Sequence, residues 1–135
     1  MFRFENLEIW KKSIEIAEKL FDISDDLERK KLYKLSDFIK ETFWIPAFAG
    51  MTVSLDECLS HSCGSRNPVL LKAITVKNRS NQFLNIAKRS CFENANMMIL
   101  FEKREYIQNH VKQKILSELE DLCRMISGFI KNLRT

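Results

Sequence analysis

The spacing of large apolar residues constrains this chain most, because four segments repeat them at alternating steps of three and four residues. Side chains at this spacing share one face of an α-helix, so each segment is predicted to be an amphipathic helix. The most regular stripe is Val111, Ile115, Leu119, Leu122, Ile126, Phe129 and Leu133. Because a helix of this kind must bury its apolar face against others, the four segments favour a bundle with one shared core.

The first predicted helix begins at Asn6, a residue type that caps helix N-termini, and a polar corner over residues 22–26 follows it. Its stripe is Leu7, Trp10, Ile14, Ala17 and Phe21, widened by Ile9, Ser13, Ile16 and Leu20. A second helix starts near Glu28 with the stripe Leu32, Leu35, Ile39 and Thr42.

The third predicted helix runs from Asn81, and a short break over residues 103–105 separates it from the fourth. Its stripe is Leu84, Ala87, Cys91, Ala95, Met98 and Phe101. Short connections at the outer ends favour antiparallel neighbours, so the predicted fold is all-α, an antiparallel up-down-up-down four-helix bundle.

The periodicity is lost between the second and third helices. Both prolines of the chain and two of its three glycines lie between residues 45 and 68, and no period of 3.6 or 2 runs through this interval. We therefore predict a single domain over residues 1–135 that contains a long irregular insertion over residues 45–76. One alternative stays open, in which the third helix extends backwards through Leu70, Leu71, Ile74 and Val76.

The net charge and the N-terminal residues suggest a cellular compartment and a class of partner. The net charge is +4, and most of the basic excess lies beyond residue 79, so a phosphate-bearing partner is compatible with it. The N-terminus lacks a basic stretch followed by an apolar core, and no apolar run is long enough to span a bilayer. We expect a cytoplasmic protein without membrane attachment, whose four cysteines are free thiols.

Candidate catalytic and metal-binding motifs are weak. Cys58, His61 and Cys63 lie close together, but zinc needs a further ligand and the other histidine, His110, belongs to a distant helix. His110 has no serine or cysteine placed as its nucleophile, and the glycines do not form a phosphate-binding loop. We expect neither an enzyme nor a protein that binds a metal, a cofactor or a small-molecule substrate.

The basic residues of the third helix are the candidate binding site. They fall on this helix or at its ends, where they could line a face that contacts nucleic-acid phosphates without reading sequence. The residues are Arg79, Lys88, Arg89, Lys103 and Arg104. Phe83, Phe92 and Phe101 do not interleave with them as a base-stacking platform requires, and fit a core or a subunit interface better. The alternative is that these cations merely solvate the bundle.

Three stretches together resemble one bacterial family. They read FENLEIWKKS over residues 4–13, YKLSDFI over residues 33–39 and FLNIAKRSCFENANM over residues 83–97. They look like the four-helix-bundle proteins encoded in intervening sequences of bacterial 23S rRNA genes. The resemblance implies a ring-like homopentamer without known enzymatic activity. A related branch, the accessory variability protein of diversity-generating retroelements, binds nucleic acid and a reverse transcriptase, so the resemblance implies RNA or DNA as a partner.

The chain departs from this family between its second and third helices. The family carries a turn resembling S-I-x-x-N-I-A-E-G there, whereas this chain has WIPAFAGMT over residues 44–52 and CGSRNP over residues 63–68. This segment resembles translated bacterial palindromic repeat DNA. Two alternatives to a nucleic-acid-binding protein therefore stay open: a protein–protein interaction scaffold, and a repeat-disrupted family member that has lost its activity.

Overall fold

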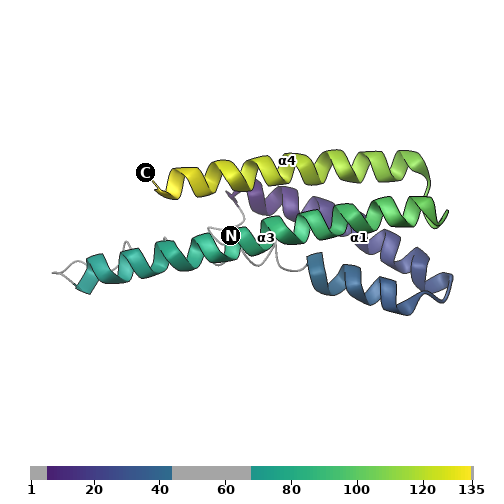
Figure 1. The fold of residues 1–135 in the computed structure, drawn as a ribbon, viewed down its shortest axis with the longest axis horizontal. Helices are drawn as coiled ribbons and strands as arrows, with labels where there is room; N and C mark the ends of the chain where they lie inside the picture. Colours follow the sequence, from purple (N-terminus) through teal and green to yellow (C-terminus); the bar gives the residue numbers. More distant parts are fainter. Residues whose placement is uncertain (1–5, 44–67, 135) are drawn as a thin grey trace.

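The computed structural model describes residues 6–43 and 68–134. Three long helices are α1 (Glu8–Arg29), α3 (Pro68–Lys103) and α4 (Asn109–Arg134), and a further helix covers residues 33–43 (Figure 1). Within these described ranges there is no strand. The all-α prediction and the four-helix architecture are confirmed.

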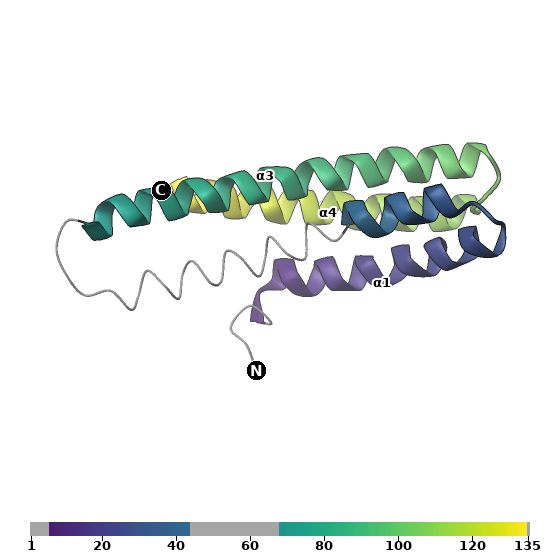
Figure 2. The same cartoon turned by 90° about the horizontal axis from the view of Figure 1, so that it is seen from below.

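The helices alternate in direction along the chain. Figure 2 shows the helix over residues 33–43 returning antiparallel to α1, while α3 and α4 form a second antiparallel pair beside them. α4 packs against both α3 and α1. The turn after α1 and the turn after α3 therefore lie at the same end of the bundle, as the predicted up-down-up-down order requires.

α3 is much longer than its partners. Its 36 residues correspond to about 54 Å of helix and the 26 residues of α4 to about 39 Å, so the N-terminal end of α3 projects beyond the end of α4 (Figure 1). Pro68 occupies the first helical position, where its missing N–H costs no hydrogen bond. The predicted irregular stretch is thus too long at its C-terminal side, because residues 68–76 are helical. Its remainder, residues 45–67, lies outside the described residues.

The core follows the predicted stripes of the third and fourth helices. Its fully buried members on these two helices are Leu84, Ala87, Cys91, Met98, Phe101, Ile115, Leu119, Leu122 and Ile126. The helix over residues 33–43 adds Ile39 and Phe43. Phe129 and Val111 are partly buried at the edges of this core.

α1 differs from its prediction in rotation and length. Ile16 and Leu20 are fully buried, whereas Phe21 is 37% exposed, so the residues expected to widen the stripe are its centre. The helix continues through the predicted polar corner to Arg29, because Ile23 and Leu27 extend the buried face while the aspartates point outward. Asn6 does not cap α1: Leu7 holds the N-cap position, and no side-chain hydrogen bond closes that end.

Both turns at the shared end close with the same backbone motif. Lys31 follows α1 with φ 62°, and the N–H of Leu32 donates to the carbonyl of Leu27 at 2.9 Å. Glu105 follows α3 with φ 61°, and the N–H of Tyr106 donates to the carbonyl of Phe101 at 2.8 Å. These are Schellman caps, in which a left-handed residue usually occupied by glycine ends the helix.

Polar side chains join the helices at two places. Ser24 and Ser36 hydrogen-bond in the interior between α1 and the helix over residues 33–43, and Ser36 Oγ donates to Glu28 Oε1 at 2.9 Å. Lys19 on α1 forms an ion pair with Glu118 on α4. In the described part of the chain, no helix is both long and apolar enough to cross a membrane.

Candidate nucleic-acid interface

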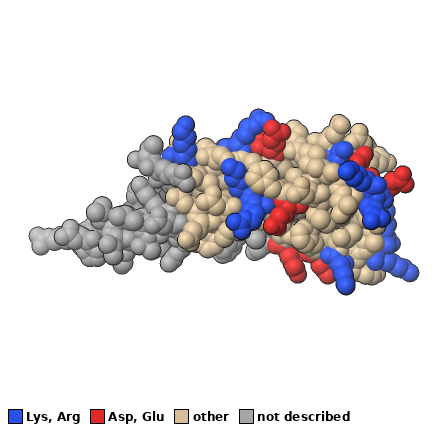
Figure 3. Space-filling view, in the orientation of Figure 1, with Lys and Arg blue, Asp and Glu red and all other residues tan. Residues whose placement is uncertain are grey.

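The end of the bundle that carries both turns gathers basic side chains from two separate parts of the chain. We call this surface the basic end, and its residues are Arg29, Lys30, Lys31, Lys34, Lys103 and Arg104, all exposed. Figure 3 shows Lys and Arg concentrated at this end of the visible face. Lys30 Nζ donates to the backbone carbonyl of Tyr106 at 2.7 Å, so the two turns touch.

Most of these cations have no carboxylate partner in the part of the chain that the structure describes. Arg29 pairs with Asp26 at 3.0 Å, and the bond of Lys30 to a neutral carbonyl leaves its charge uncompensated. Within residues 6–43 and 68–134, no ion pair forms at Lys31, Lys34, Lys103 and Arg104. Unpaired exposed cations of this kind can neutralise phosphates, since no internal ion pair must first be broken.

A shallow groove of about 630 Å³ adjoins the basic end. It runs between the last turn of α1 and the turn that joins α3 to α4, and Ile23, Tyr106, Ile107 and Val111 give it an apolar floor. Glu102 and Glu105 line it together with Lys30, and Glu102 also pairs with Lys112 at 3.5 Å. The groove therefore carries acidic rim residues, and the candidate surface for phosphates is the set of exposed cations of the basic end outside the groove.

The structure divides the predicted site residues into two groups. Lys103 and Arg104 belong to the basic end, whereas Arg89 lies about 21 Å from Lys103 along α3. Arg89 is exposed, and Lys88 is half-buried toward α4. Arg79 lies on α3, and its side chain is outside the described residues. The predicted residues thus follow one long helix and do not converge on a single patch.

Sequence reasoning missed the contribution of the first turn to this surface. The predicted site contains only residues of the third helix and its ends, and Lys30, Lys31 and Lys34 are not among them. The signal that could have found them is topological: in an up-down-up-down bundle the first and third connections meet at one end. When the first and third connections are both basic, this topology predicts that their cations form one surface.

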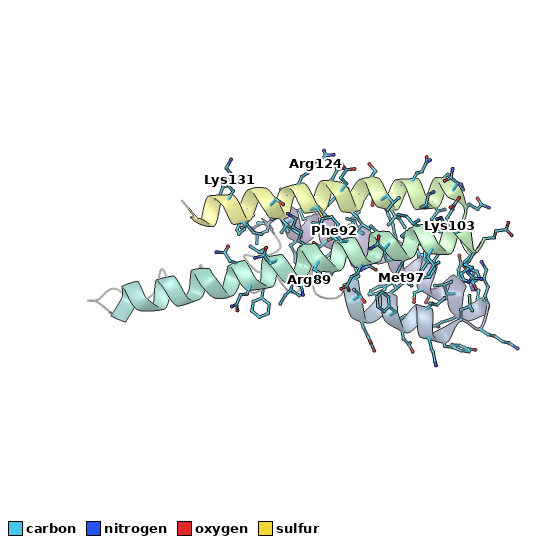
Figure 4. The ribbon with its side chains drawn as sticks, viewed as in Figure 1. Arg89, Phe92, Met97, Lys103, Arg124 and Lys131 are labelled. Atoms are coloured by element: carbon cyan, nitrogen blue, oxygen red, sulfur yellow. The ribbon has the colours of Figure 1, made fainter. Side chains whose placement is uncertain are left out.

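The outer face of α3 carries an unusual number of exposed apolar side chains. Phe92 is 55% exposed and Leu100 is 45% exposed, and Ile86 and Ile99 accompany them. Arg89, Phe92 and Lys103 are labelled along this helix in Figure 4. Of the three phenylalanines assigned to a core or subunit interface, Phe101 is fully buried, Phe83 is partly buried and Phe92 faces outward.

Two free thiols meet where α3 and α4 pack together. Cys91 is 1% exposed and Cys123 is half-buried. A hydrogen bond from Cys91 to Cys123 raises the pKa of Cys91, and burial raises it further. The same bond lowers the pKa of Cys123, and the nearby charge of Lys88 acts in the same direction.

The candidate metal ligands receive no support from the described residues. In the ranges that the structure places, no group of three or more His, Cys, Asp or Glu side chains could hold a metal ion. Cys58, His61 and Cys63 lie outside these ranges, and His110 is exposed in the first turn of α4.

Comparison of the chain with models of protein families, with curated proteins and with solved structures found no match.

Proposed function

We propose that this chain is a non-catalytic, oligomeric four-helix-bundle protein of the cytoplasm that binds the phosphate backbone of RNA or DNA. One observation carries the proposal: two turns distant in sequence bring Lys31, Lys34, Lys103 and Arg104 to one end of the bundle, where none of them has a carboxylate partner among the described residues. The resemblance to proteins encoded in 23S rRNA intervening sequences favours the same class of ligand.

The mode of binding is electrostatic. A double helix carries one negative charge per about 1.7 Å of axis, and cations that contact it release its condensed counterions. The basic end offers four lysines and two arginines, and Tyr33 is a single exposed aromatic side chain beside them rather than a stacking platform, so this surface is suited to phosphates and not to base edges. Binding should then be insensitive to sequence and steeply sensitive to salt.

Self-association is the second element of the proposal. The exposed Phe92, Ile99 and Leu100 on α3 would be covered if copies of the chain packed through this helix. The resemblance implies a homopentamer, and a ring would repeat the basic end around its rim and multiply the phosphate contacts. Light-scattering mass of the full chain measures the number of subunits.

The test is fluorescence anisotropy at low salt with a labelled 30-base-pair DNA duplex and a labelled 23S rRNA fragment. The double variant Lys103→Glu with Arg104→Glu should abolish binding, and Lys88→Glu with Arg89→Glu should weaken it less. A control for net charge, Arg124→Glu with Lys131→Glu, makes the same change in charge on α4, where both side chains point away from α3 (Figure 4). It also breaks the exposed ion pairs of Arg124 with Glu120 and Asp121, so circular dichroism must show that this variant stays folded. Equal losses in all three variants would show that only net charge matters, and would contradict a site at the basic end.

A protein–protein interaction scaffold is the second candidate, and the exposed Phe92 favours it. The same variants separate the two functions, because a protein partner held by apolar contacts would tolerate charge reversal at Lys103 and Arg104. Absence of binding to both nucleic acids at low salt would contradict the first proposal. Two alternatives would then remain, a protein–protein interaction scaffold and a repeat-disrupted protein that has lost its activity.

A further inference from the structure

Cys91 and Cys123 lie at the same height in the α3–α4 hairpin. Cys91 lies about 18 Å before the end of α3, and Cys123 lies about 21 Å after the start of α4. Because the two helices are antiparallel and packed together, residues at equal distances from their connecting turn lie at the same height, and the apolar core between the helices includes Cys91, with Cys123 packed against it. The topology therefore brings these two thiols together across the helix interface.

The two thiols differ in access. Cys91 belongs to the buried core of α3, whereas Cys123 packs against that core from α4 and stays partly open to solvent. The thiol of Cys123 raises the pKa of Cys91 and the thiol of Cys91 lowers the pKa of Cys123, as expected of two thiols that lie near each other across the helix interface. Lys88 lies one helical turn before Cys91 and adds a positive charge beside Cys123.

This arrangement provides the two groups that a two-cysteine oxidation site needs, a reactive thiol and a second thiol that resolves it. A half-exposed thiol beside a cation and a hydrogen-bond donor has thiolate character, and thiolates are the species that peroxides oxidise. A second thiol at the same height across the helix interface can resolve the oxidised sulfur. A buried pair of structural cysteines would lack the access that Cys123 has.

We propose that Cys123 is a modification site for hydroperoxides, and that Cys91 converts the oxidised Cys123 into an intramolecular disulfide between α3 and α4. This inference is independent of nucleic-acid binding. The site takes a small hydroperoxide, such as hydrogen peroxide or an alkyl hydroperoxide.

The chemistry proceeds in two steps. The thiolate of Cys123 attacks the outer peroxide oxygen, the O–O bond breaks, and the leaving oxygen takes up a proton as an alcohol or water. Cys123 is then a sulfenic acid. The sulfur of Cys91 attacks the Cys123 sulfur, the S–O bond breaks, and the hydroxyl leaves as water with the proton of the Cys91 thiol. Two thiols supply the two electrons that reduce one peroxide.

The test uses the full-length chain with Cys58→Ser and Cys63→Ser, so that Cys91 and Cys123 are the remaining thiols. The folded protein is treated with a small excess of hydrogen peroxide, blocked with iodoacetamide, cleaved with trypsin and examined by mass spectrometry. We expect the peptides over residues 90–103 and 115–124 to be joined, with a mass two hydrogens below their sum, and dithiothreitol to separate them. Recovery of both peptides alkylated, or of Cys123 oxidised without a link to Cys91, would overturn the proposal.

Two variants assign the roles of the thiols. With Cys91→Ala, the sulfenic acid of Cys123 cannot be resolved, and dimedone, which reacts with sulfenic acids, should label the peptide over residues 115–124. With Cys123→Ala, Cys91 should stay unmodified in the folded protein, and circular dichroism checks that each variant keeps its helices. Dimedone labelling of Cys91 in the second variant would reverse the assignment and contradict the proposed order of steps.

Discussion

The ammonium group of Lys30, just after α1, donates a hydrogen bond of 2.7 Å to the backbone carbonyl of Tyr106, in the turn between α3 and α4. This bond joins two connections that are 76 positions apart in the sequence. It leaves the charge of Lys30 in place and holds the lysines of the first turn beside Lys103 and Arg104. The basic end is therefore one surface rather than two loops.

Replacement of Glu105 by glycine should stabilise the protein. Glu105 has φ 61°, a left-handed conformation that costs a residue with a side chain about 1 to 2 kcal/mol and costs glycine little. We expect Glu105→Gly to raise the free energy of unfolding by about 0.5 to 1 kcal/mol in urea denaturation, after the larger entropy loss of glycine is deducted. Glu105→Ala keeps the strain and is the matched control. Equal stabilities of the glycine and alanine variants would contradict this explanation.

The core of α4 should not tolerate a charge. Ile115 is 2% exposed, and an aspartate there would lose the apolar burial and place an unpaired carboxylate in the core, which together remove much of a typical stability margin of about 5 to 15 kcal/mol. Ile115→Asp should give a chain without a cooperative thermal transition in circular dichroism. Lys114→Asp, one residue earlier and exposed, should keep the transition within a few degrees. Lys112 is a poorer control, because its pair with Glu102 would be lost as well.

Acid should weaken the contact between α1 and the helix over residues 33–43. Hydrogen bonds from Lys40 and Ser36 hold the pKa of Glu28 below its usual value of 4.5. A lowered carboxyl pKa in the folded state contributes stability above pH 4.5, and this contribution is lost as the pH falls through the lowered pKa.

The measurement is urea denaturation of the wild type and of Glu28→Gln between pH 7 and pH 3. The difference in their unfolding free energies should be largest near neutral pH and should shrink below pH 4.5. Glu8→Gln is the control, since Glu8 is an exposed residue of the first turn of α1. A difference between wild type and Glu28→Gln that stays constant across this range would contradict the role of Glu28.

Lys88 should set the reactivity of Cys123. The groups that act on Cys123 are the thiol of Cys91 and the ammonium of Lys88, which lower its pKa, and the carboxylate of Glu120, which raises it. Lys88→Met removes one lowering influence, so the pKa of Cys123 should rise and its thiolate fraction at pH 7 should fall. Iodoacetamide labelling of the peptide over residues 115–124 should slow, and its pH midpoint should move upward. Arg89→Met, at the adjacent exposed position, should leave the midpoint unchanged.

The sequence predicts the fold well where one apolar stripe is continuous. On α4 the stripe from Ile115 to Ile126 has no competing apolar face, so its periodicity identifies the buried side. On α1 two adjacent stripes are apolar, one through Phe21 and one through Leu20, and the position of α4 decides which is buried. Local sequence contains no information on that choice.

The end of α1 and the full set of site residues were harder to predict, because neither is marked by a local sequence signal. α1 ends at a lysine in the left-handed conformation, so the glycine that usually marks such an end is absent from residues 29–32. Lys103 and Arg104 were predicted as site residues from their place on the third helix, but their neighbours Lys31 and Lys34 depend on how two turns meet. The contact of Lys30 with Tyr106 is tertiary, and no spacing in the sequence encodes it.

The most direct test of the account is the salt dependence of duplex DNA binding by the wild type and by Lys103→Gln with Arg104→Gln. The slope of log K against log salt reports the phosphates that are neutralised, at about 0.9 per contact on B-form DNA. We predict a steep negative slope for the wild type and a slope shallower by about 1.8 per subunit for the variant, from two lost contacts. A wild-type affinity that does not change with salt, or identical slopes for the two proteins, would contradict phosphate binding by the basic end.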